Sequence, residues 1–368
     1  MDGRRDVLVI GGGPAGLAAA IAARGKGFEV TVVDGVEPPV DKACGEGLLP
    51  DTVRALRELG VTILPGEGMA FKGIRFLDAT SSVEGQFPSI NGIGIRRTLL
   101  HKKMVARAEE CGVSFLWNTP VSGVCEGSAM LGGQVVRAKW IVGADGINSR
   151  VRRWAGLDSG PNDHTRFAQT CHYRMKPWTD CVEIHWGPKM QVYVTPVSRE
   201  EICLALISHD PRMRLAEALK EFPWLATRLR EAELSDTSRG AITVTRKVGR
   251  VYRGHIALLG DASGSVDAIT GEGLCQSFRQ ALALADAMAA GHLKSYQTVH
   301  HRLARRPRLM GRLLLRLDQC SSVRRRVLKA LAQNPRLFSR LLAIHVGEAS
   351  ALHSMTTTAL LGWQLLAA

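Results

Sequence analysis

The sequence predicts a mixed α/β protein: a three-layer domain around a parallel sheet, an antiparallel sheet inserted into it, and a helical C-terminus. Three observations predict this fold. Strand-like apolar runs alternate with helical patterns over residues 1–160, which is typical of a parallel sheet covered by helices. Four strand-like runs follow one another over residues 167–208 with no helix between them, as expected of antiparallel strands. From residue 293 onward the apolar spacing is helical.

Composition narrows the class of protein. The 368 residues are 45% hydrophobic and 22% charged, which is typical of a globular protein of about two domains. The apolar start resembles a secretory leader, but Asp6 interrupts it and the glycines that follow need a folded turn, so we expect none. No run reaches the ~18 apolar residues of a membrane span. Eight cysteines without a C-x-x-C pair indicate a reduced cytoplasmic setting, with no disulfide framework and no metal site.

The most informative segment covers residues 6–34, DVLVIGGGPAGLAAAIAARGKGFEVTVVD. An apolar run leads into a G-x-G-x-x-G turn, an alanine-rich helix follows, and a second apolar run ends on Asp34. This is the fingerprint of a Rossmann-like dinucleotide-binding unit. We expect Gly11 to form the tight turn, Gly13 to admit a pyrophosphate to the backbone N–H groups, and Gly16 to let the helix pack closely. The helix N-terminus favours the phosphates, and Asp34 would accept from the ribose hydroxyls.

Two later segments place acids at the ends of strands. Residues 141–153 (IVGADGINSRVRR) bring a strand to Asp145, and residues 256–287 bring another to Asp261 before Gly271-Glu272-Gly273 opens a long helix. An acid at a strand end can hold polyol hydroxyls, and a glycine-flanked helix start can hold an anionic ring edge.

In this order, the motifs resemble those of the FAD-dependent para-hydroxybenzoate hydroxylase and geranylgeranyl reductase superfamily, from Asp6 to about Ala290. The resemblance implies that FAD is the dinucleotide, that Asp145 serves both FAD and NAD(P)H, and that Asp261 holds the ribityl chain. It also implies that NAD(P)H docks transiently as electron donor, because no second G-x-G-x-x-G follows a strand. The cofactor-binding residues implied are Gly11, Gly13, Pro14, Ala15, Gly16, Asp34, Ala43, Cys44, Gly45, Arg97, Val121, Asp145, Asp261, Gly271 and Gly273.

Two further matches concern the subgroup. Residues 42–47 (KACGEG) look like the K-x-C-G-x-x segment of geranylgeranyl-reductase-like members, which lies near the flavin, and Arg97 resembles the family arginine that contacts FAD. There are departures. Ala268 stands where the family usually has proline, the aromatic Y-x-W-x-F-P segment reads QVYVTPV here, and the lysine context of tryptophan halogenases is not evident. These departures weaken the prenyl-reductase and halogenase assignments.

The predicted domains are discontinuous. The FAD-binding domain takes residues 1–78, 92–160 and 250–292, and the substrate-binding sheet takes 79–91 and 161–249. Residues 293–368 form a basic helical region. From Lys294 onward, 13 Lys and Arg stand against two acids, so this region carries +11 of the net charge of +14. It either covers the body with amphipathic helices or offers a basic surface to an anionic membrane or an acidic carrier protein; a nucleic acid is disfavoured, because no recognition motif accompanies the arginines.

Three residues are candidates for catalysis. His185 and Tyr193 lie on neighbouring predicted strands and would act in acid–base chemistry if their faces coincide, although a structural role is the simpler interpretation. Cys44 is a candidate proton donor or a small buried residue. We expect His101, His300 and His301 to be solvated, because their helical patterns are rich in charge.

The function we infer is that of an FAD-dependent oxidoreductase. The favoured reaction is NAD(P)H-driven monooxygenation of a lipophilic aromatic or polyketide-derived substrate. The first alternative is a geranylgeranyl-reductase-like enzyme that saturates isoprenoid double bonds, and the second is a non-catalytic flavin-binding protein that docks on membranes. We expect a cytoplasmic protein, with peripheral attachment to a membrane left open.

Overall fold

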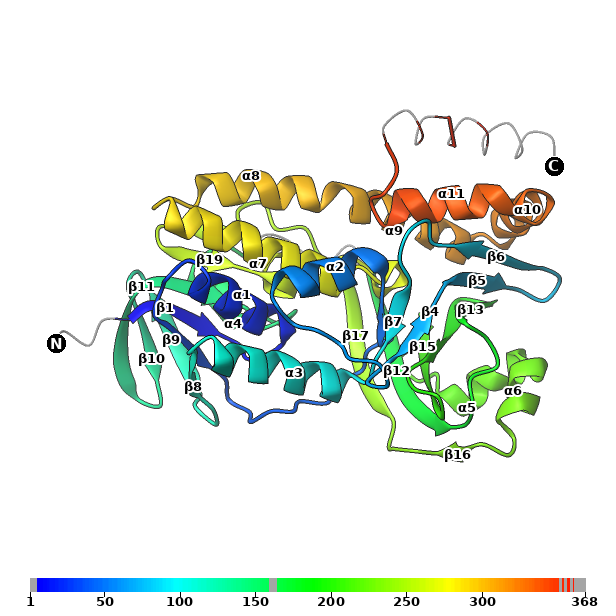
Figure 1. The fold of residues 1–368 in the computed structure, drawn as a ribbon, viewed down its shortest axis with the longest axis horizontal. Helices are drawn as coiled ribbons and strands as arrows, with labels where there is room; N and C mark the ends of the chain where they lie inside the picture. The colour runs from blue at the N-terminus through cyan, green and yellow to red at the C-terminus, as the bar shows by residue number, and fades with distance from the viewer. Residues whose placement is uncertain (1–4, 159–163, 351–352, 354–355, 358–359, 361–368) are drawn as a thin grey trace.

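The computed structural model describes residues 5–158, 164–350, 353, 356–357 and 360. Two large sheets lie side by side, and helices cover both of them (Figure 1). The mixed α/β class, the parallel first sheet and the helical C-terminal region that the sequence predicts are confirmed.

The first sheet carries the dinucleotide fingerprint. Its central strand pairs in parallel with a neighbour on each side, so that the strand order reverses there, which is where ligands bind in doubly wound sheets. The strands, in spatial order, are β18 (Tyr252–Arg253), β19 (Ile256–Leu258), β11 (Gln134–Gly143), β1 (Arg5–Ile10), β2 (Val30–Val33) and β8 (Ser114–Leu116), with β9 (Val121–Cys125) and β10 (Ser128–Leu131) added beyond β11.

Apolar helices cover this sheet because its strands are buried on both faces. Every residue of β2 is buried, and α1 is alanine-rich, with nine of its residues buried, so that it packs closely against its neighbours. The helices of this domain are α1 (Pro14–Arg24), α2 (Pro50–Glu58), α3 (Arg97–Glu110), α4 (Arg150–Trp154) and α7 (Gly273–Ala289). α1 contacts both α3 and α7.

The second sheet is mostly antiparallel and includes the four strands predicted over residues 167–208. Its strands, in spatial order, are β16 (Glu233–Leu234), β12 (His164–Arg174), β15 (Glu201–Ser208), β14 (Met190–Pro196), β13 (Cys181–Gly187), β5 (Gly73–Leu77) and β6 (Ser82–Gln86), with β17 (Arg239–Thr245) also paired to β12. A small third sheet joins β3 (Gly47–Leu48), β7 (Gly92–Gly94) and β4 (Met69–Phe71).

The structure corrects one predicted domain boundary. The division at residue 78 assigns β5 to the first domain, but β5 pairs in parallel with β13 and antiparallel with β6. The second sheet therefore begins at Gly73. The sequence signal was weak here because β5 is short and its other partner, β13, begins more than 100 residues further along the chain.

Two other segments differ from what their sequence patterns predict. The apolar pattern over 211–235 predicts a helix, but the stretch is broken into α5 (Leu215–Ala218), a 3₁₀ turn and α6 (Pro223–Leu229), because Pro223 cannot continue a helix. The run over 250–259 predicts one strand, but it forms a short hairpin of β18 and β19, which turns at Gly254 with φ +53°.

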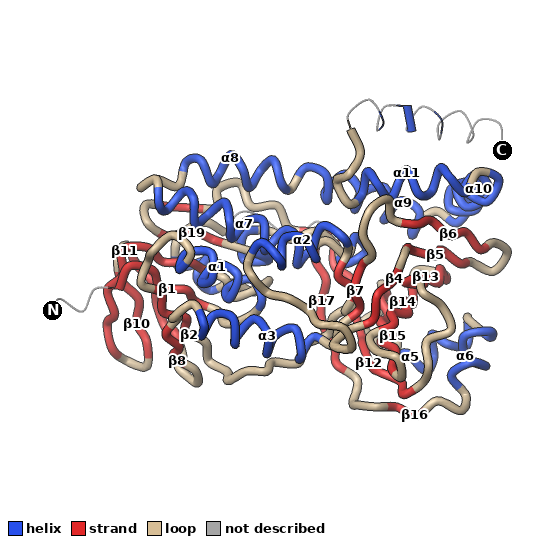
Figure 2. Tube along the Cα trace, in the orientation of Figure 1, coloured by secondary structure: helices blue, strands red, loops and turns tan. Residues whose placement is uncertain are grey.

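The C-terminal helices pack on the body. They are α8 (Lys294–Leu303), α9 (Arg305–Gln319), α10 (Ser321–Gln333) and α11 (Pro335–His345). α8 lies on α7, while α9 to α11 cover one face of the second sheet (Figure 2). Phe338 contacts Phe76 of β5 with ring centroids 4.8 Å apart. The amphipathic covering role is therefore confirmed, and none of the described helices is long and apolar enough to cross a membrane.

One buried guanidinium joins three parts of the chain. Arg166 of β12 bonds to Asp267, which precedes the start of α7, and to Asp318 of α9 at 3.4 Å. The side chains of all three are fully buried. Gln191 accepts from the same guanidinium at 2.9 Å. A buried charge is tolerated when it is paired and hydrogen-bonded on all sides, so these segments must stay in register.

We expect Arg166→Met to destabilise the protein by about 3–5 kcal/mol, because two buried carboxylates lose their counter-charge. Arg174→Met on the same strand is the matched control, since Arg174 pairs with Glu233 at the exposed surface and such pairs contribute little. Urea unfolding measures both. Equal effects of the two substitutions would contradict this assignment of the buried cluster.

Candidate functional site

The glycine turn after β1 has the geometry that a dinucleotide requires. Gly11 has φ +111°, and a Cβ there would lie 2.4 Å from the Ala144 carbonyl oxygen. A Cβ at Gly16 would lie 1.8 Å from the Gly11 oxygen, whereas one at Gly13 would meet nothing within 4 Å. Gly11 and Gly16 are therefore needed for packing, and Gly13 keeps space open at the N-terminus of α1. Pro14 and Ala15 begin this helix, where N–H groups are free to bind an anion.

The acid at the end of β2 fixes this turn. The Asp34 carboxylate accepts from the Gly12 N–H at 2.6 Å and from the Val36 N–H at 3.0 Å. The Thr119 N–H donates to the Asp34 carbonyl. Val121, two residues after Thr119, begins β9. Asp34 and Val121 thus lie at one end of the candidate site; their contacts with an adenosine stay a prediction.

His101 is not solvated as expected, but buried against the turn. Its Nδ1 accepts from the Val40 N–H at 3.0 Å, so its Nε2 carries the proton and donates to the Gly12 carbonyl at 2.8 Å. Burial lowers the pKa of His101, which keeps the ring neutral. His300 is buried as well and its pKa is lowered to about 3, chiefly by burial. His301 is exposed, as expected. The many charged residues around His101 and His300 in their helices gave no indication that the two imidazole rings are buried.

Asp145 has a structural role that the motif did not indicate. Its carboxylate accepts from the Ser149 hydroxyl at 2.5 Å and from the Arg150 and Val151 N–H groups at 2.7 and 3.1 Å. It therefore caps α4. The predicted contacts of Asp145 with FAD and NAD(P)H would add to this cap.

Four side chains, those of Asp261, Arg97, Lys42 and Cys44, lie near one another between the two sheets, in the region that we call the recess. Asp261 follows β19, and its side chain is exposed to solvent. The surrounding protein raises the pKa of Asp261, and the charges of Arg97 and Lys42 oppose this rise. Arg97 begins α3 and also contacts the thiol of Cys44. The Arg97 Nε is buried without a partner. The motifs at residues 42–47, 97 and 261 are thus brought together as predicted.

Burial is the main cause that raises the pKa of Cys44, against the opposing influence of Arg97. The thiol is therefore protonated near neutral pH. Next to it, a Cβ at Gly45 would meet nothing within 4 Å, so the loop Ala43–Gly45 faces open space. The loop rests on the second sheet, where Thr195 donates to the Gly45 carbonyl at 2.8 Å and the Cys203 thiol lies 3.6 Å from the Cys44 carbonyl.

The C-terminal helices hold the far side of the recess. Gly271 has φ +66°, and a Cβ at Gly273 would meet nothing within 4 Å, so the start of α7 is open. Between these glycines, the buried Glu272 accepts from Arg306 of α9, which also donates to Asp51 of α2, each at 3.0 Å. His345 of α11 lies 2.9 Å from the Thr270 carbonyl. These contacts fix the helix start that was predicted to face a flavin.

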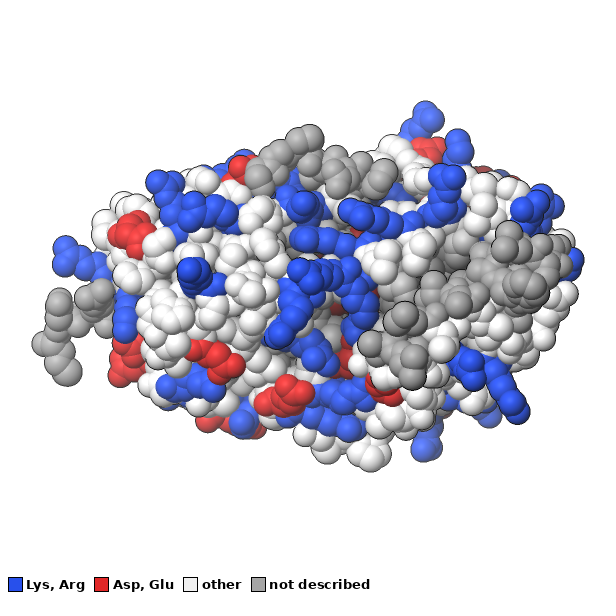
Figure 3. All heavy atoms as spheres, turned by 90° about the horizontal axis from the view of Figure 1, so that it is seen from above, with Lys and Arg blue, Asp and Glu red and all other residues white. Residues whose placement is uncertain are grey.

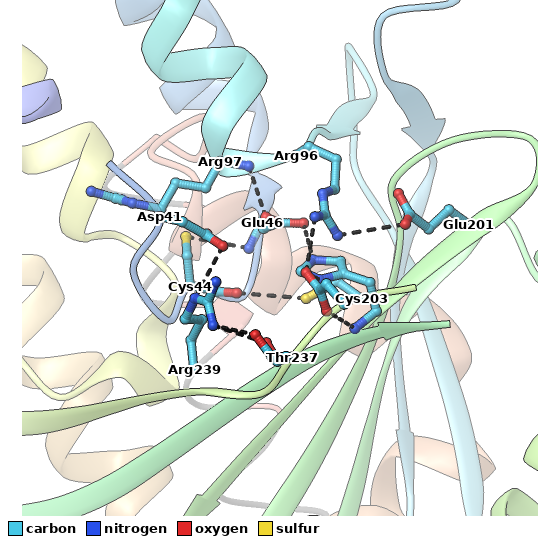
Figure 4. Close-up of polar contacts among 11 residues, drawn as sticks. Asp41, Cys44, Glu46, Arg96, Arg97, Glu201, Cys203, Thr237 and Arg239 are labelled. Carbon is cyan, nitrogen blue, oxygen red and sulfur yellow. Dashed lines mark hydrogen bonds and ion pairs between the residues drawn. The ribbon is translucent and has the colours of Figure 1, made fainter. Parts of the chain in front are cut away.

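A chain of ionic hydrogen bonds, not predicted from the sequence, crosses from the cofactor side to the second sheet (Figure 4). Glu46 accepts from the Arg97 N–H at 2.7 Å and lies 2.8 Å from His172 Nε2. His172 Nδ1 lies 2.8 Å from Asp236, which Arg96 contacts at 3.0 Å. Carboxylates near neutral pH only accept, so both ring nitrogens of His172 must donate.

His172 is therefore an imidazolium. Burial lowers its pKa most strongly, but the bonds to Glu46 and the charge of Asp236 outweigh that effect and raise the pKa overall. Cys203 lies close enough to Glu46 and His172 for the three to share a metal ion, yet a doubly protonated ring cannot ligate one. No local pattern could have revealed this chain, because Glu46 and His172 are 126 residues apart.

The structure does not bring His185 and Tyr193 together. In the register of β13 and β14, Tyr193 is paired with Ile184 and His185 with Val192, so the two side chains point to opposite faces. His185 bonds to Glu183 at 3.1 Å and packs near Phe222 and Trp224, under α6. It lies on the face away from Tyr193, so the condition set for a shared acid–base role, that the two faces coincide, is not met; a catalytic role for His185 stays a prediction.

Tyr193 shares a face with Thr195, which holds the Cys44–Gly45 loop. Burial raises the pKa of Tyr193, and its hydroxyl is buried without a partner. Of the three predicted catalytic residues, Cys44 is thus in the recess, Tyr193 is on the correct face of the sheet, and His185 is on the wrong face.

The comparisons with known proteins agree with this geometry. A family described as an FAD binding domain matches residues 4–296. Menaquinone reductase from Mycolicibacterium smegmatis is 26% identical and spans 81% of this chain and 80% of its own length. Digeranylgeranylglycerophospholipid reductase 1 from Methanopyrus kandleri is 30% identical over 73% of this chain and 76% of its own. A flavoprotein/dehydrogenase from Cytophaga hutchinsonii has a TM-score of 0.79 at 19% identity, covering 93% and 92% of the two chains.

The glycine turn, the open start of α7 and the recess between them define an FAD-dependent oxidoreductase. The chain belongs to the FAD-binding-domain family, in the para-hydroxybenzoate hydroxylase and geranylgeranyl reductase superfamily. The relatives named above are reductases, which supports an FAD-dependent enzyme over the non-catalytic alternative. The residues fit FAD, because Gly13, Gly45 and Gly273 all leave open space where a cofactor would approach the backbone.

We expect Gly16→Ala and Gly13→Ala to separate folding from FAD binding. Gly16→Ala forces a backbone clash with Gly11 and should destabilise the protein by about 1–3 kcal/mol. Gly13→Ala meets no protein atom, so its unfolding curve without FAD should match wild type while its FAD affinity falls about tenfold or more. Thermal unfolding and FAD titration measure the two effects; a Gly13→Ala protein with normal affinity would contradict the placement of the pyrophosphate.

We expect His172→Gln to cost more stability at about pH 6 than at about pH 9. The folded-state pKa of His172 is raised above 6.5, so its contribution is complete below that value and is lost as the pH rises through the folded pKa. Urea unfolding of wild type and variant at both pH values tests this. His301→Gln, at an exposed position of α8, is the control. A difference that does not change with pH would contradict a protonated His172.

Proposed function

We propose that this enzyme reduces carbon–carbon double bonds of an isoprenoid chain in a lipophilic substrate, with NAD(P)H as the source of electrons. The observation that carries the proposal is the protonated thiol of Cys44, held beside Arg97 at the recess between the two sheets. The curated relatives named above support it, since they are named as reductases of menaquinone and of a digeranylgeranyl phospholipid. We therefore prefer reduction to the monooxygenation that the sequence favoured.

Reduction of an alkene needs a hydride at one carbon and a proton at the other. A bound flavin, once reduced by NAD(P)H, would supply the hydride and return to the oxidised FAD form. The proton comes from the Cys44 S–H, and the thiolate that remains lies beside the Arg97 guanidinium, which favours the negative charge. Burial keeps the proton on sulfur until the carbanion develops, because the thiol pKa is raised.

The chain of hydrogen bonds from Arg97 through Glu46 to His172 also orients the Cys44 thiol. The Glu46 N–H lies 3.4 Å from the Cys44 sulfur, and the Glu46 side chain is fixed by Arg97 and His172. Glu46 has φ +56°, a conformation that is rare for a side chain of this kind and persists only where the surroundings hold it. Glu46 is thus a positioning residue for the thiol, and His172 and Asp236 hold Glu46.

Hydroxylation of a lipophilic aromatic remains the second candidate because of one observation. The Tyr193 hydroxyl is buried without a partner on the face of the sheet that carries the Cys44–Gly45 loop. A buried hydroxyl normally finds a partner, and a phenolic oxygen would supply it. This candidate requires oxygen as co-substrate, whereas the reduction does not.

We further propose that the basic C-terminal face lies against an anionic membrane surface from which the substrate is taken. Lys and Arg dominate over Asp and Glu on the face that α8 and α11 form (Figure 3). On α9, Leu309 and Leu313 are more than half exposed next to arginines, a pattern that suits the headgroup boundary of a membrane.

We expect Cys44→Ala to slow double-bond saturation by about 10²- to 10⁴-fold, the usual contribution of a general acid. The assay is anaerobic: dithionite-reduced enzyme reacts with a geranylgeranyl lipid or a menaquinone, and mass spectrometry detects the gain of two hydrogens per bond. Cys171→Ala is the matched control, since Cys171 is buried on the opposite face of the sheet.

Two results would contradict the proposal. A Cys44→Ala enzyme that holds FAD and saturates the substrate at the wild-type rate would exclude the thiol as proton donor. A product that forms only with oxygen and gains one oxygen atom would favour hydroxylation instead.

A further inference from the structure

A small basic cavity lies where the second sheet, the loop before α7 and helix α9 meet. Its volume is about 180 Å³. Since a water occupies about 30 Å³ in the liquid, the cavity has room for a tetrahedral anion. Its basic lining comes from the end of β17 and from one face of α9: Arg246, Lys247, Arg308, Arg312 and Arg316.

Among the described residues, Arg246 is paired with Asp158, and the other four cations of the lining form no ion pair with a carboxylate. Asp267 is the acid of the lining, and its carboxylate is already engaged by Arg166 and by the Ile269 N–H. Asp318 of α9 faces the buried cluster, where Arg166, Gln191 and His209 occupy it. Arg246 donates to Asp158 through Nη1 at 3.0 Å.

Several of the donors have no partner. The Arg246 Nε is buried and unbonded, which is costly for a polar group. Within the described chain, Arg308, Arg312 and Arg316 contact no carboxylate. Burial first, and the charge of Arg312 second, lower the pKa of Arg308. The three arginines lie four residues apart, and like charges at that spacing destabilise a helix.

We propose that this cavity binds a phosphate group, carried either by the headgroup of a lipid or by a free phosphate compound. Guanidinium groups match the oxygens of phosphate and donate to them in pairs. A bound phosphate would offset the repulsion among the three arginines of α9. The cavity shares no residue with the glycine turn after β1, so it is separate from the site of the FAD pyrophosphate.

The location gives the site a consequence for catalysis. Val266 and Asp267 line the cavity, and four residues further on the same loop reaches Gly271 and the start of α7. A ligand here therefore contacts the segment that carries the flavin-facing glycines. The inference rests on the cavity alone and does not require the proposed reduction, so either can fail without the other.

Calorimetric titration of the FAD-loaded protein with inorganic phosphate and with pyrophosphate, at constant ionic strength, tests the site. We expect saturable binding to wild type and at least about tenfold weaker binding to Arg308→Gln/Arg312→Gln. Arg325→Gln/Arg326→Gln is the matched control: it removes the same charge from the exposed face of α10 and should bind like wild type. Without phosphate, the variant Arg308→Gln/Arg312→Gln, called the cavity variant, should unfold at or above the wild-type temperature. If this double variant does not fold, Arg312→Gln alone takes its place.

Vesicles distinguish the two sources of phosphate. Sedimentation with phosphatidylcholine vesicles that contain phosphatidic acid should be lost in the cavity variant, and competed by phosphate, if a lipid headgroup is the ligand. If wild type, cavity variant and control bind vesicles equally, while the cavity variant no longer binds pyrophosphate, the ligand of the site is a free phosphate compound. The proposal is overturned if no protein binds phosphate in either form, or if wild type, variant and control bind it equally, or if the control loses as much affinity as the variant.

Discussion

The structure depends on one buried guanidinium. Arg166 belongs to the second sheet, Asp267 to the loop before α7, and Asp318 to the C-terminal region, and all three are removed from water. Buried charges tolerate little displacement, since separation leaves each one uncompensated. The sheet, the loop and α9 are therefore held at one point, and the recess between the two sheets has its shape because of it.

The C-terminal helices are consequently part of the site. Arg306 of α9 reaches both Glu272 and Asp51, and His345 of α11 reaches the Thr270 carbonyl, so two of these helices fix the start of α7. Apart from Arg324, which is buried against Trp186, their remaining cations lie at the surface or line the cavity beside Asp267. A region that carries +11 of the net charge thus joins a structural role on its inner side with an anion-attracting role on its outer side.

The sequence was sufficient wherever a signal is local. The glycine turn, the strands over 167–208 and the long helix after Gly271 all depend on residues that are close along the chain, and the structure confirms those elements. The cofactor contacts of Asp34 and Arg97 stay predictions. Distant pairing was not accessible. The register of β13 and β14 separates His185 from Tyr193, and β5 pairs with β13, which begins more than 100 residues later in the sequence.

The same limit explains the missed residues. His172 has an unremarkable place on a strand, and only folding brings Glu46 to one of its nitrogens and Asp236 to the other. His101 and His300 sit in helices rich in charge, yet both face inward. Helical periodicity reports which face is apolar; it does not report which polar side chain on that face finds a buried carbonyl or hydroxyl.

The central claim is that Cys44 and the start of α7 face the same flavin ring. An experimental structure of the FAD complex with a bound prenyl substrate analogue tests it most directly. We expect the pyrophosphate to lie against Gly13, the pyrimidine edge to lie against the Gly273 N–H, and the Cys44 sulfur to contact the double bond of the analogue. A flavin ring placed away from Gly273, or an analogue whose double bond lies out of reach of Cys44, would contradict it.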